Sequence, residues 1–405
     1  MDEIILSVKK KKEHLIPITP RPEFSMVRGD GHYLYDNTGK EYLDLIQGWA
    51  VNTLGHSPQI IQQTLSEQSA QLVNPGPAFY NQPMLDLAET LCQHSVFDQV
   101  FFANSGAEAN EGAIKLARKW GQKNKQGAFK IITFNQGFHG RTLATMSACG
   151  KPAFEPLFEP KVSGFTKVDY NDLVAVEKAV DQHTVAIMLE LVQGEAGVIP
   201  AQMAFVKELE RLCQQHNLLL IVDEVQTGIG RTGSLFAYEQ YGIKPHMMTL
   251  GKGLGGGVPI SALLVNQAVS CFDYGDQGGT YNGNPLMCAV AGAVLDEVLK
   301  PEFLPNVQAC STYLQERLER LSAEFGLGPI RGKGLLLALD MSALKTHGVN
   351  AADIVQKAMD AGLLLNAPRP DTLRFMPALT LTEKEIDQAM EILSTLFSVV
   401  TSEQV

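Results

Sequence analysis

The sequence predicts an α/β protein, with a mainly parallel central sheet in a large domain and a smaller α+β domain formed by the two ends of the chain. Three features predict this fold class. Several short runs in the middle of the chain are apolar throughout, as in strands that are covered on both faces. Helical patterns separate these runs, and strand–helix alternation favours parallel strands joined by right-handed crossovers. The last third changes to long helical stripes with isolated short strands between them.

The first 50 residues contain short strands of their own, at 33–35 and 42–45, which we expect to pack with the C-terminal part. In the large domain, a helix beginning near Ala107 carries apolar residues at helical spacing as far as Trp120, and a second helix covers 206–213. The apolar runs expected to form the strands of this domain are 100–102, 130–134, 185–189, 218–222, 247–250 and 260–265.

Two helices with two strands between them are expected in the last third. The first helix is an apolar stripe that ends at Gly326, a common helix stop. Thr382 and Glu385 form a capping-box pattern before the second helix. The strands are expected at 335–339 and 372–375. The prediction divides the chain into an N-terminal segment that packs with the small domain, the large domain and the C-terminal small domain, at 1–50, 51–294 and 295–405.

The composition argues against several classes of protein. The chain has 405 residues, with 33 lysines and arginines against 44 aspartates and glutamates, and a formal net charge of −11. This balance argues against nucleic acid or an anionic membrane as the main partner. No apolar run approaches the roughly 18 residues that span a bilayer, and the start of the chain fits neither a secretory nor a mitochondrial leader. The six cysteines form no CxxC pair, so we expect reduced thiols, no metal site and a cytoplasmic location.

Ligands of open α/β sheets bind at the carboxyl ends of the strands, so the residues that follow each predicted strand are candidates for a site. Ser105, Gly106 and Ala107 follow the run 100–102 and open a helix. The free N–H groups and the positive end of the helix dipole could hold a phosphate there. The alternative is an ordinary Ser-Gly helix cap.

Two charged residues follow two other strands. Asp223 leaves a buried strand, where a carboxylate is costly unless it has a cationic partner, although an N-cap or a structural ion pair is the alternative. Lys252 follows the run 247–250 and is flanked by glycines. It is either a surface lysine in a loop or a desolvated amine that attacks carbonyl groups.

Together the three strand ends match the needs of pyridoxal phosphate. The helix start would anchor the phosphate, Lys252 would form the Schiff base, and Asp223 would keep the pyridine nitrogen protonated so that the ring accepts electrons. A competing GxGxxG pattern at 228–233 is interpreted as a turn, because no acidic residue ends the next strand where a ribose would bind.

Six segments carry a family resemblance: 104–111, 138–142, 193–195, 223–228, 252–253 and 280–285. In these segments, and over 29–397 as a whole, the chain resembles the class III (ω-type) aminotransferases, and among them the acetylornithine aminotransferases most. The resemblance implies the fold type I of pyridoxal-phosphate-dependent transferases. It also implies a homodimer whose two active sites are shared between the subunits.

The resemblance implies a role for each residue that would hold the cofactor. Ser105, Gly106 and Ala107 would bind the phosphate, and Thr280 would reach the phosphate of the neighbouring subunit. Phe138 would stack on the ring, Asp223 would pair with the ring nitrogen, and Gln226 would reach the ring hydroxyl. Lys252 would form the Schiff base and transfer the proton. For the substrate, Arg141 would hold the α-carboxylate, with Tyr33 assisting.

The family also implies a gate for two different substrates. The donor reacts at its terminal amine, whereas 2-oxoglutarate carries a carboxylate beside the reacting carbon. Glu195 and Arg374 stand where a glutamate masks an arginine during the donor half-reaction and releases it for the acceptor; a structural ion pair is the alternative. The implied reaction transfers the δ-amino group of N2-acetyl-L-ornithine to 2-oxoglutarate, giving N-acetyl-L-glutamate 5-semialdehyde and L-glutamate, a step of arginine biosynthesis.

Three alternatives remain open from the sequence. The first is a different amino donor: ornithine, succinylornithine, 4-aminobutyrate or acetyl-lysine. Gly-Gly-Thr-Tyr at 278–281 also resembles 4-aminobutyrate aminotransferases. An aminomutase or decarboxylase on the same fold is the second. A binding protein without chemistry is the third, against which Lys252 and Asp223 both argue.

Overall fold

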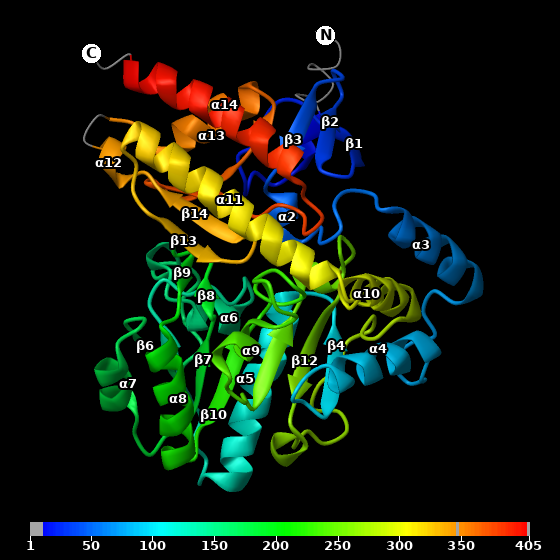
Figure 1. Cartoon of the computed structure of the whole chain (residues 1–405). Coiled ribbons are helices and arrows are strands. Elements are labelled where there is room, and N and C mark those ends of the chain that lie inside the picture. The colour runs from blue at the N-terminus through cyan, green and yellow to red at the C-terminus, as the bar shows by residue number, and fades with distance from the viewer. Residues whose placement is uncertain (1–10, 346–347, 403–405) are drawn as a thin grey trace.

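A seven-stranded sheet forms the centre of the large domain, in the lower half of Figure 1. The structure is a computed structural model that describes residues 11–345 and 348–402. The strands, in spatial order, are β4 (Gln99–Ala103), β12 (Ser261–Val265), β11 (Met247–Leu250), β10 (Leu219–Asp223), β7 (Thr184–Leu189), β5 (Lys130–Phe134) and β6 (Phe165–Val168). Only β12 runs antiparallel to its two neighbours in this sheet, so the expectation of a mainly parallel sheet is confirmed.

Helices cover both faces of this sheet. Leu219 and Ile221 of β10 pack in the same cluster as Ile114 of α5 (Gly106–Asn124). The alternate residue Leu220 packs with Phe205 of α8 (Met203–His216) on the opposite face. Burial on both faces is the reason why these strands are apolar throughout. The other helices of this domain are α3 (Gln59–Gln71), α4 (Gln82–Gln93), α6 (Leu143–Ala148), α7 (Leu173–Ala179), α9 (Ala237–Tyr241) and α10 (Pro285–Val298).

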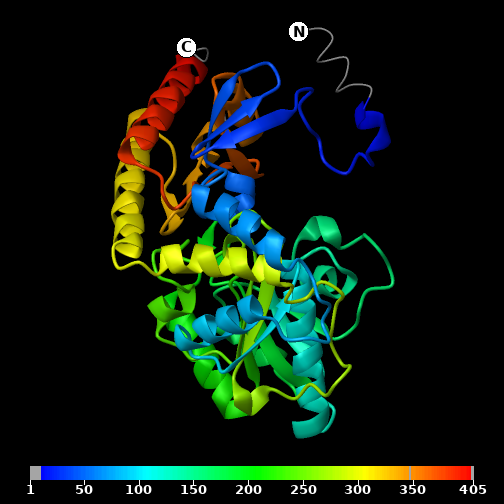
Figure 2. The same ribbon diagram turned by 90° about the vertical axis from the view of Figure 1, so that its right-hand side faces the viewer.

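Helices α3 and α4 each pack against α10 beside the sheet, as Figure 2 shows. Short elements complete the loops at the upper edge of the large domain. They are the two-residue strands β8 (Val192–Gln193) and β9 (Ile199–Pro200), and the 3-10 turns η2 (Pro152–Phe154) and η3 (Lys252–Leu254). A further 3-10 turn, η4 (Gln267–Val269), follows the antiparallel strand β12 at the opposite edge of the sheet.

The small domain is an antiparallel sheet with helices on one side. Its strands are ordered β13 (Ile330–Lys333), β14 (Leu336–Asp340), β17 (Thr372–Phe375) and β16 (Asn366–Arg369). The helices are α11 (Phe303–Phe325), α12 (Ser342–Lys345), α13 (Ala351–Asp360) and α14 (Glu383–Ser402). Gly326 ends α11 in the left-handed region at φ 63°, the conformation that glycine adopts without strain.

The N-terminal strands join the small domain through one parallel pairing. They are β1 (Met26–Asp30), β2 (Tyr33–Asp36) and β3 (Glu41–Asp44), and β3 pairs with β15 (Leu363–Leu364). The 3-10 turn η1 (Lys12–His14) precedes them and α2 (Gln47–Ala50) follows. The proposed boundary at 294 falls inside α10, which ends at Val298. Within the described residues, no helix has both the length and the apolar character needed to cross a bilayer.

Candidate active site

The carboxyl ends of β4, β10 and β11 lie at one edge of the large sheet, facing the small domain (Figure 1). A Cβ atom on Gly106 would lie 2.6 Å from Cγ1 of Val225, and one on Gly251 would lie 3.3 Å from the Cα of Gly106. The segments around Ser105, Asp223 and Lys252 therefore meet, as the positions of these residues after their strands predict.

The start of α5 is built to bind an anion. Ser105 caps the helix, since its hydroxyl accepts the N–H of Glu108 at 3.3 Å while the Glu108 carboxylate accepts the N–H of Ser105 at 2.8 Å. A Cβ atom on Gly106 would collide with Val225, so glycine permits this close approach, and the first turn stays partly exposed at Ser105, Gly106 and Ala107. The site has the form expected for a phosphate.

Asp223 is fixed at the end of β10 by three donors within 3.1 Å. Its Oδ2 accepts hydrogen bonds from the side-chain amide of Asn110 and from Nδ1 of His139, both at 2.8 Å. The N–H of Val225 donates to Oδ1 at 3.1 Å. Burial opposes a charge on the imidazole, but the hydrogen bond and the charge of Asp223 raise the pKa of His139. The carboxylate is thus held in one orientation in an almost water-free place.

His139 and Asn110 are positioning residues that the sequence interpretation missed. Both lie in segments that carry the family resemblance, 138–142 and 104–111, but the sequence assigned neither of them a role. Asn110 also accepts the hydroxyl of Thr249 at 2.7 Å and donates to the carbonyl of His139 at 2.7 Å. The only signal in the sequence was the position of Asn110 one turn inside the helix that Ser105 caps.

Lys252 occupies a strained position directly after β11. Its φ angle is 40°, a region that side-chain-bearing residues rarely adopt and that is found mostly where function holds it. Burial, and next the positive charge of Arg374, lower the pKa of Lys252 against the opposing charge of Asp223. A lysine amine with a lowered pKa is more readily neutral and therefore nucleophilic.

Phe138 lies beside this lysine site, held by a buried carboxylate. Its N–H donates to Oε2 of Glu190 at 2.8 Å, and its ring packs against Phe154 at 6.1 Å between centroids. Burial raises the pKa of Glu190 to about 7, an effect that the charge of His139 opposes. Glu190 is another group whose part in the site the sequence interpretation missed.

Glu195 and Arg374 form the ion pair that was predicted. Glu195 lies in the turn between β8 and β9 of the large domain, and Arg374 lies in β17 of the small domain. The distance from Arg374 Nη2 to Glu195 Oε1 is 2.9 Å, and Nε of Arg374 donates to Asn366 at 2.9 Å. The second terminal nitrogen, Nη1, is buried and has no hydrogen-bond partner among the described residues.

A third charged residue, Lys151, contacts this ion pair, and no sequence pattern indicated it. Its Nζ lies 3.0 Å from Glu195 Oε2. Burial opposes the charge of Glu195, but Arg374 and Lys151 together lower the pKa of this carboxyl to about 2. The carboxylate is therefore ionised throughout the physiological range.

The remaining predicted residues differ in their placement. Arg141 is exposed, with its guanidinium carbon 4.9 Å from the centre of the Phe154 ring, and Gln226 is buried against Gly194. Thr280 is exposed. Within the described part of the chain, the hydroxyl of Tyr33 donates to Gln388 of α14 at 2.9 Å and not to a member of this cluster.

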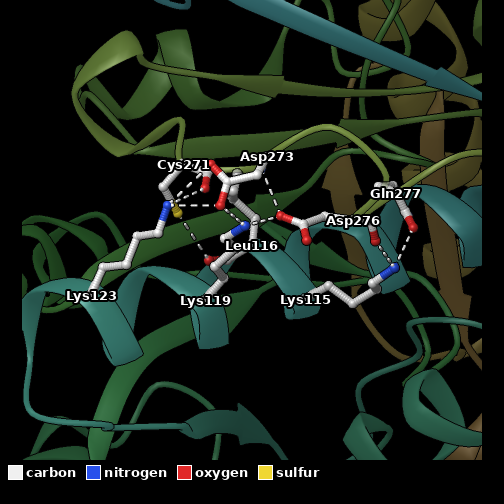
Figure 3. Close-up of polar contacts among 8 residues, drawn as sticks. All are labelled: Lys115, Leu116, Lys119, Lys123, Cys271, Asp273, Asp276 and Gln277. Atoms are coloured by element: carbon white, nitrogen blue, oxygen red, sulfur yellow. Dashed lines mark hydrogen bonds and ion pairs between the residues drawn. The ribbon is translucent and has the colours of Figure 1, made fainter.

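The loop that carries Thr280 is fastened to α5, the helix that Ser105 caps. Figure 3 shows three lysines one turn apart on α5, Lys115, Lys119 and Lys123, that reach the segment 271–277. Lys119 pairs with both Asp273 and Asp276. The C-terminal half of α5 and the loop before α10 are thus held together.

The aminotransferase class-III family matches residues 18–397, nearly the whole chain. The chain belongs to this family. An acetylornithine aminotransferase 2 from Bordetella bronchiseptica is 54% identical over 390 residues, which are 96% of this chain and 98% of the relative. An acetylornithine aminotransferase from Ralstonia nicotianae is 55% identical over 388 residues, 95% of this chain and 97% of the relative.

Solved aminotransferase structures have the same architecture. An ornithine aminotransferase of Toxoplasma gondii superposes with a TM-score of 0.93 at 30% identity, over 98% of this chain and 96% of that one. An N-acetylornithine aminotransferase of Stenotrophomonas maltophilia superposes with a TM-score of 0.83 at 36% identity, over 97% of this chain and 99% of that one. A second Toxoplasma ornithine aminotransferase structure superposes with a TM-score of 0.92 at 31% identity, over 98% of this chain and 94% of that one. That structure has pyridoxal phosphate at its active site in partial occupancy.

Pyridoxal phosphate is the cofactor of class-III aminotransferases, and the residues present here fit it. The partly exposed first turn of α5 suits the phosphate of the cofactor. Asp223 is a buried carboxylate whose orientation is fixed by three close donors. Lys252 supplies an amine whose pKa is lowered. The three groups follow β4, β10 and β11 at one edge of the sheet, where β12 separates β4 from β11.

Proposed function

We propose that the chain catalyses the transfer of the δ-amino group of N2-acetyl-L-ornithine to 2-oxoglutarate, which gives N-acetyl-L-glutamate 5-semialdehyde and L-glutamate. The observation that carries the proposal is the Glu195–Arg374 pair, in which a buried arginine keeps one terminal nitrogen without a partner. A guanidinium with free donors binds a carboxylate strongly, and a glutamate on its other nitrogen can mask it. The names of the relatives at 54% and 55% identity support acetylornithine as the donor.

Pyridoxal phosphate, when bound, supplies an electron sink for the carbon that gains or loses the amine. The residues of the chain divide the remaining work. Asp223, oriented by His139 and Asn110, would hold the ring nitrogen, while the start of α5 would hold the phosphate. Lys252 would hold the aldehyde carbon and carry the proton on its Nζ to and from the substrate carbon.

The two half-reactions need Arg374 in opposite states, either paired with Glu195 or free to bind a carboxylate. The donor presents its terminal amine and an uncharged chain, so Arg374 is best neutralised by Glu195 while the donor is bound. 2-Oxoglutarate presents a carboxylate next to the reacting carbon and needs Arg374 exposed to it. Arg141, exposed beside Phe138 and Phe154, would hold the α-carboxylate of the donor and the distal carboxylate of 2-oxoglutarate.

We further propose that the active unit is a homodimer that works in the cytoplasm as part of arginine biosynthesis. Thr280 is exposed on its own chain, and Tyr281 beside it is 63% exposed. Further exposed apolar side chains lie between α3 and α4 at Leu72, Val73, Phe79 and Tyr80. A surface of this kind is typical of a subunit interface. The free cysteines, for their part, suit a reducing compartment.

A donor panel tests the proposed reaction. The purified holoenzyme is mixed with acetylornithine, ornithine, succinylornithine, 4-aminobutyrate or acetyl-lysine in a stopped-flow spectrometer, and the cofactor absorbance follows the first half-reaction. We expect the highest specificity constant with acetylornithine. A higher value with any other donor would replace the assignment and leave the aminotransferase chemistry in place.

A further inference from the structure

Glu195 is held by two cations, one on each carboxylate oxygen. Oε1 lies 2.9 Å from Nη2 of Arg374, and Oε2 lies 3.0 Å from Nζ of Lys151. The side chains of Glu195 and Lys151 are 23% and 26% exposed, whereas that of Arg374 is 1% exposed. Lys151 thus competes with the buried arginine for the same carboxylate from the outer side.

The position of Lys151 is fixed by the backbone that precedes it. The carbonyl of Gly150 accepts the N–H of Gln136 at 2.9 Å, and its own N–H donates to Gly137 at 3.0 Å. A Cβ on Gly150 would lie 2.2 Å from the carbonyl oxygen of Phe134, so only glycine permits this close approach to the end of β5. The ammonium group also lies 5.7 Å from the centre of the Phe154 ring. The backbone around Gly150 therefore fixes Lys151 where its ammonium group pairs with Glu195.

A polar cavity of about 710 Å³ lies beside the turn that carries Glu195. Lys151 lines this cavity together with Gln193 and Ala196, which flank the turn that carries Glu195. A carboxylate that leaves Arg374 thus has space to turn into and a cation already at its edge.

We propose that Lys151 receives Glu195 when an acidic substrate takes Arg374, and so sets the affinity of the enzyme for its dicarboxylate acceptor. The inference rests on the function proposed above and extends it to a positioning residue. In the masked form Glu195 shares its charge between two cations. Once released it can turn both oxygens toward Lys151, so the ion pair with Lys151 becomes stronger as the pair with Arg374 breaks. Without Lys151 the released carboxylate would have only water.

The test measures binding of glutarate, an unreactive dicarboxylate of matching length, to the holoenzyme by titration calorimetry. We expect Lys151→Met to raise the Kd of glutarate by about fivefold, within the range of a partly buried ion pair. Lys151→Arg keeps the charge and should restore the Kd. Lys167→Met is the matched control, because Lys167 lines the same cavity but forms no ion pair with Glu195.

Half-reaction kinetics distinguish the role from a general loss of structure. Lys151→Met should raise KM for glutamate by a similar factor, and leave kcat/KM for the donor unchanged or higher. A lower donor kcat/KM, or a tighter glutarate complex, would mean that Lys151 stabilises the masked form instead, and would overturn the inference. The donor reaction of the unmodified enzyme is measured alongside, so a failure of the proposed function is seen independently.

A double-mutant cycle separates an action through Glu195 from a direct contact with the ligand. In a Glu195→Ala background, Lys151→Met should change the Kd of glutarate no more than Lys167→Met does. An undiminished fivefold effect in that background would show that Lys151 binds the dicarboxylate itself, and the inference would fail.

Discussion

At the scale of single residues, the site places ionised groups in buried surroundings and gives each one a partner. Asp223 is 4% exposed and has three donors within 3.1 Å, and Arg374 is fully buried with a carboxylate at one end. A buried charge without such partners would cost several kcal/mol. The orientation of these groups is therefore set before any ligand arrives, which is what fast chemistry at a cofactor requires.

The gate predicts an asymmetric effect for Glu195→Ala. Without the carboxylate, Arg374 is permanently exposed and its charge opposes the uncharged chain of the donor, so the donor half-reaction should lose about tenfold or more in kcat/KM. The glutamate half-reaction should be spared, because it needs Arg374 unmasked. Separate single-turnover measurements of the two half-reactions check this. Equal damage to both would leave the pair a structural one.

Glu190 predicts a pH dependence of stability. Burial raises the pKa of this carboxyl from 4.5 to about 7 in the folded protein. Between these values the unfolded chain loses the proton and the folded one keeps it, so unfolding becomes easier as pH rises. Relative to Glu190→Gln, the unmodified apoprotein should lose up to about 3 kcal/mol of unfolding free energy from pH 4.5 to 7.

Urea denaturation at a series of pH values measures this difference. Glu155→Gln is the control, because Glu155 is exposed and its replacement should shift the curve by a constant amount. Parallel curves for the unmodified protein and Glu190→Gln would contradict the prediction.

Residues at strand ends could be predicted from the sequence, whereas residues that act through them could not. Asp223 and Lys252 follow apolar strands directly, so their place at the sheet edge follows from the strand alone. His139, Asn110 and Lys151 act through side chains that are 84, 113 and 44 residues away in the chain. No local pattern records such a contact, and only the packed tertiary structure brings the partners together.

At the scale of elements, α5 links the phosphate site to the loop that carries Thr280. Lys119 is the inner lysine of the three in Figure 3, with its side chain 18% exposed against 46% for Lys123. It pairs with two aspartates and Lys123 with one. We therefore expect Lys119→Met to speed hydrogen exchange in the segment 271–284 by about fivefold, and Lys123→Met to do so less.

Mass spectrometry of the exchanged peptides checks this order. The effect of Lys119→Met should shrink at high salt, because salt screens the ion pairs that it removes. A larger effect of Lys123→Met would place the main anchor of the loop elsewhere.

The elements predicted from the sequence are those with a strong pattern. The apolar strands of the central sheet, the helices near Ala107 and at 206–213, and the helix that ends at Gly326 were expected and are present. Edge strands were missed: β6 and β13 are partly exposed, carry charged residues and have no continuous apolar run. Their strand conformation comes from pairing with neighbours rather than from local preference.

At the scale of the whole molecule, the two domains are joined where the substrate would bind. Arg374 of the small domain pairs with Glu195 of the large one, and the buried Arg231 donates to the carbonyls of Leu335 and Pro377 at 3.0 and 2.5 Å. A shift of either domain would change the distance within the gate. Its setting therefore depends on the docking of the domains as well as on the substrate.

The proposed homodimer predicts that two inactive variants restore each other. Lys252→Ala removes the reactive amine, and Thr280→Ala should weaken cofactor binding at the site of the neighbouring subunit. In a mixed dimer of these two variants, one site has both defects. The other site has an intact Lys252 from one chain and an intact Thr280 from its partner. The mixed dimer should therefore recover about half of the unmodified activity at limiting cofactor.

Co-expression with two affinity tags isolates the mixed dimer for this measurement. Each variant alone is the control, with circular dichroism to show that both are folded. If Thr280 acted on the cofactor of its own chain, the intact Lys252 would share a site with the Thr280→Ala defect. The mixed dimer would then show no recovery above the Thr280→Ala variant, and the shared site would be ruled out.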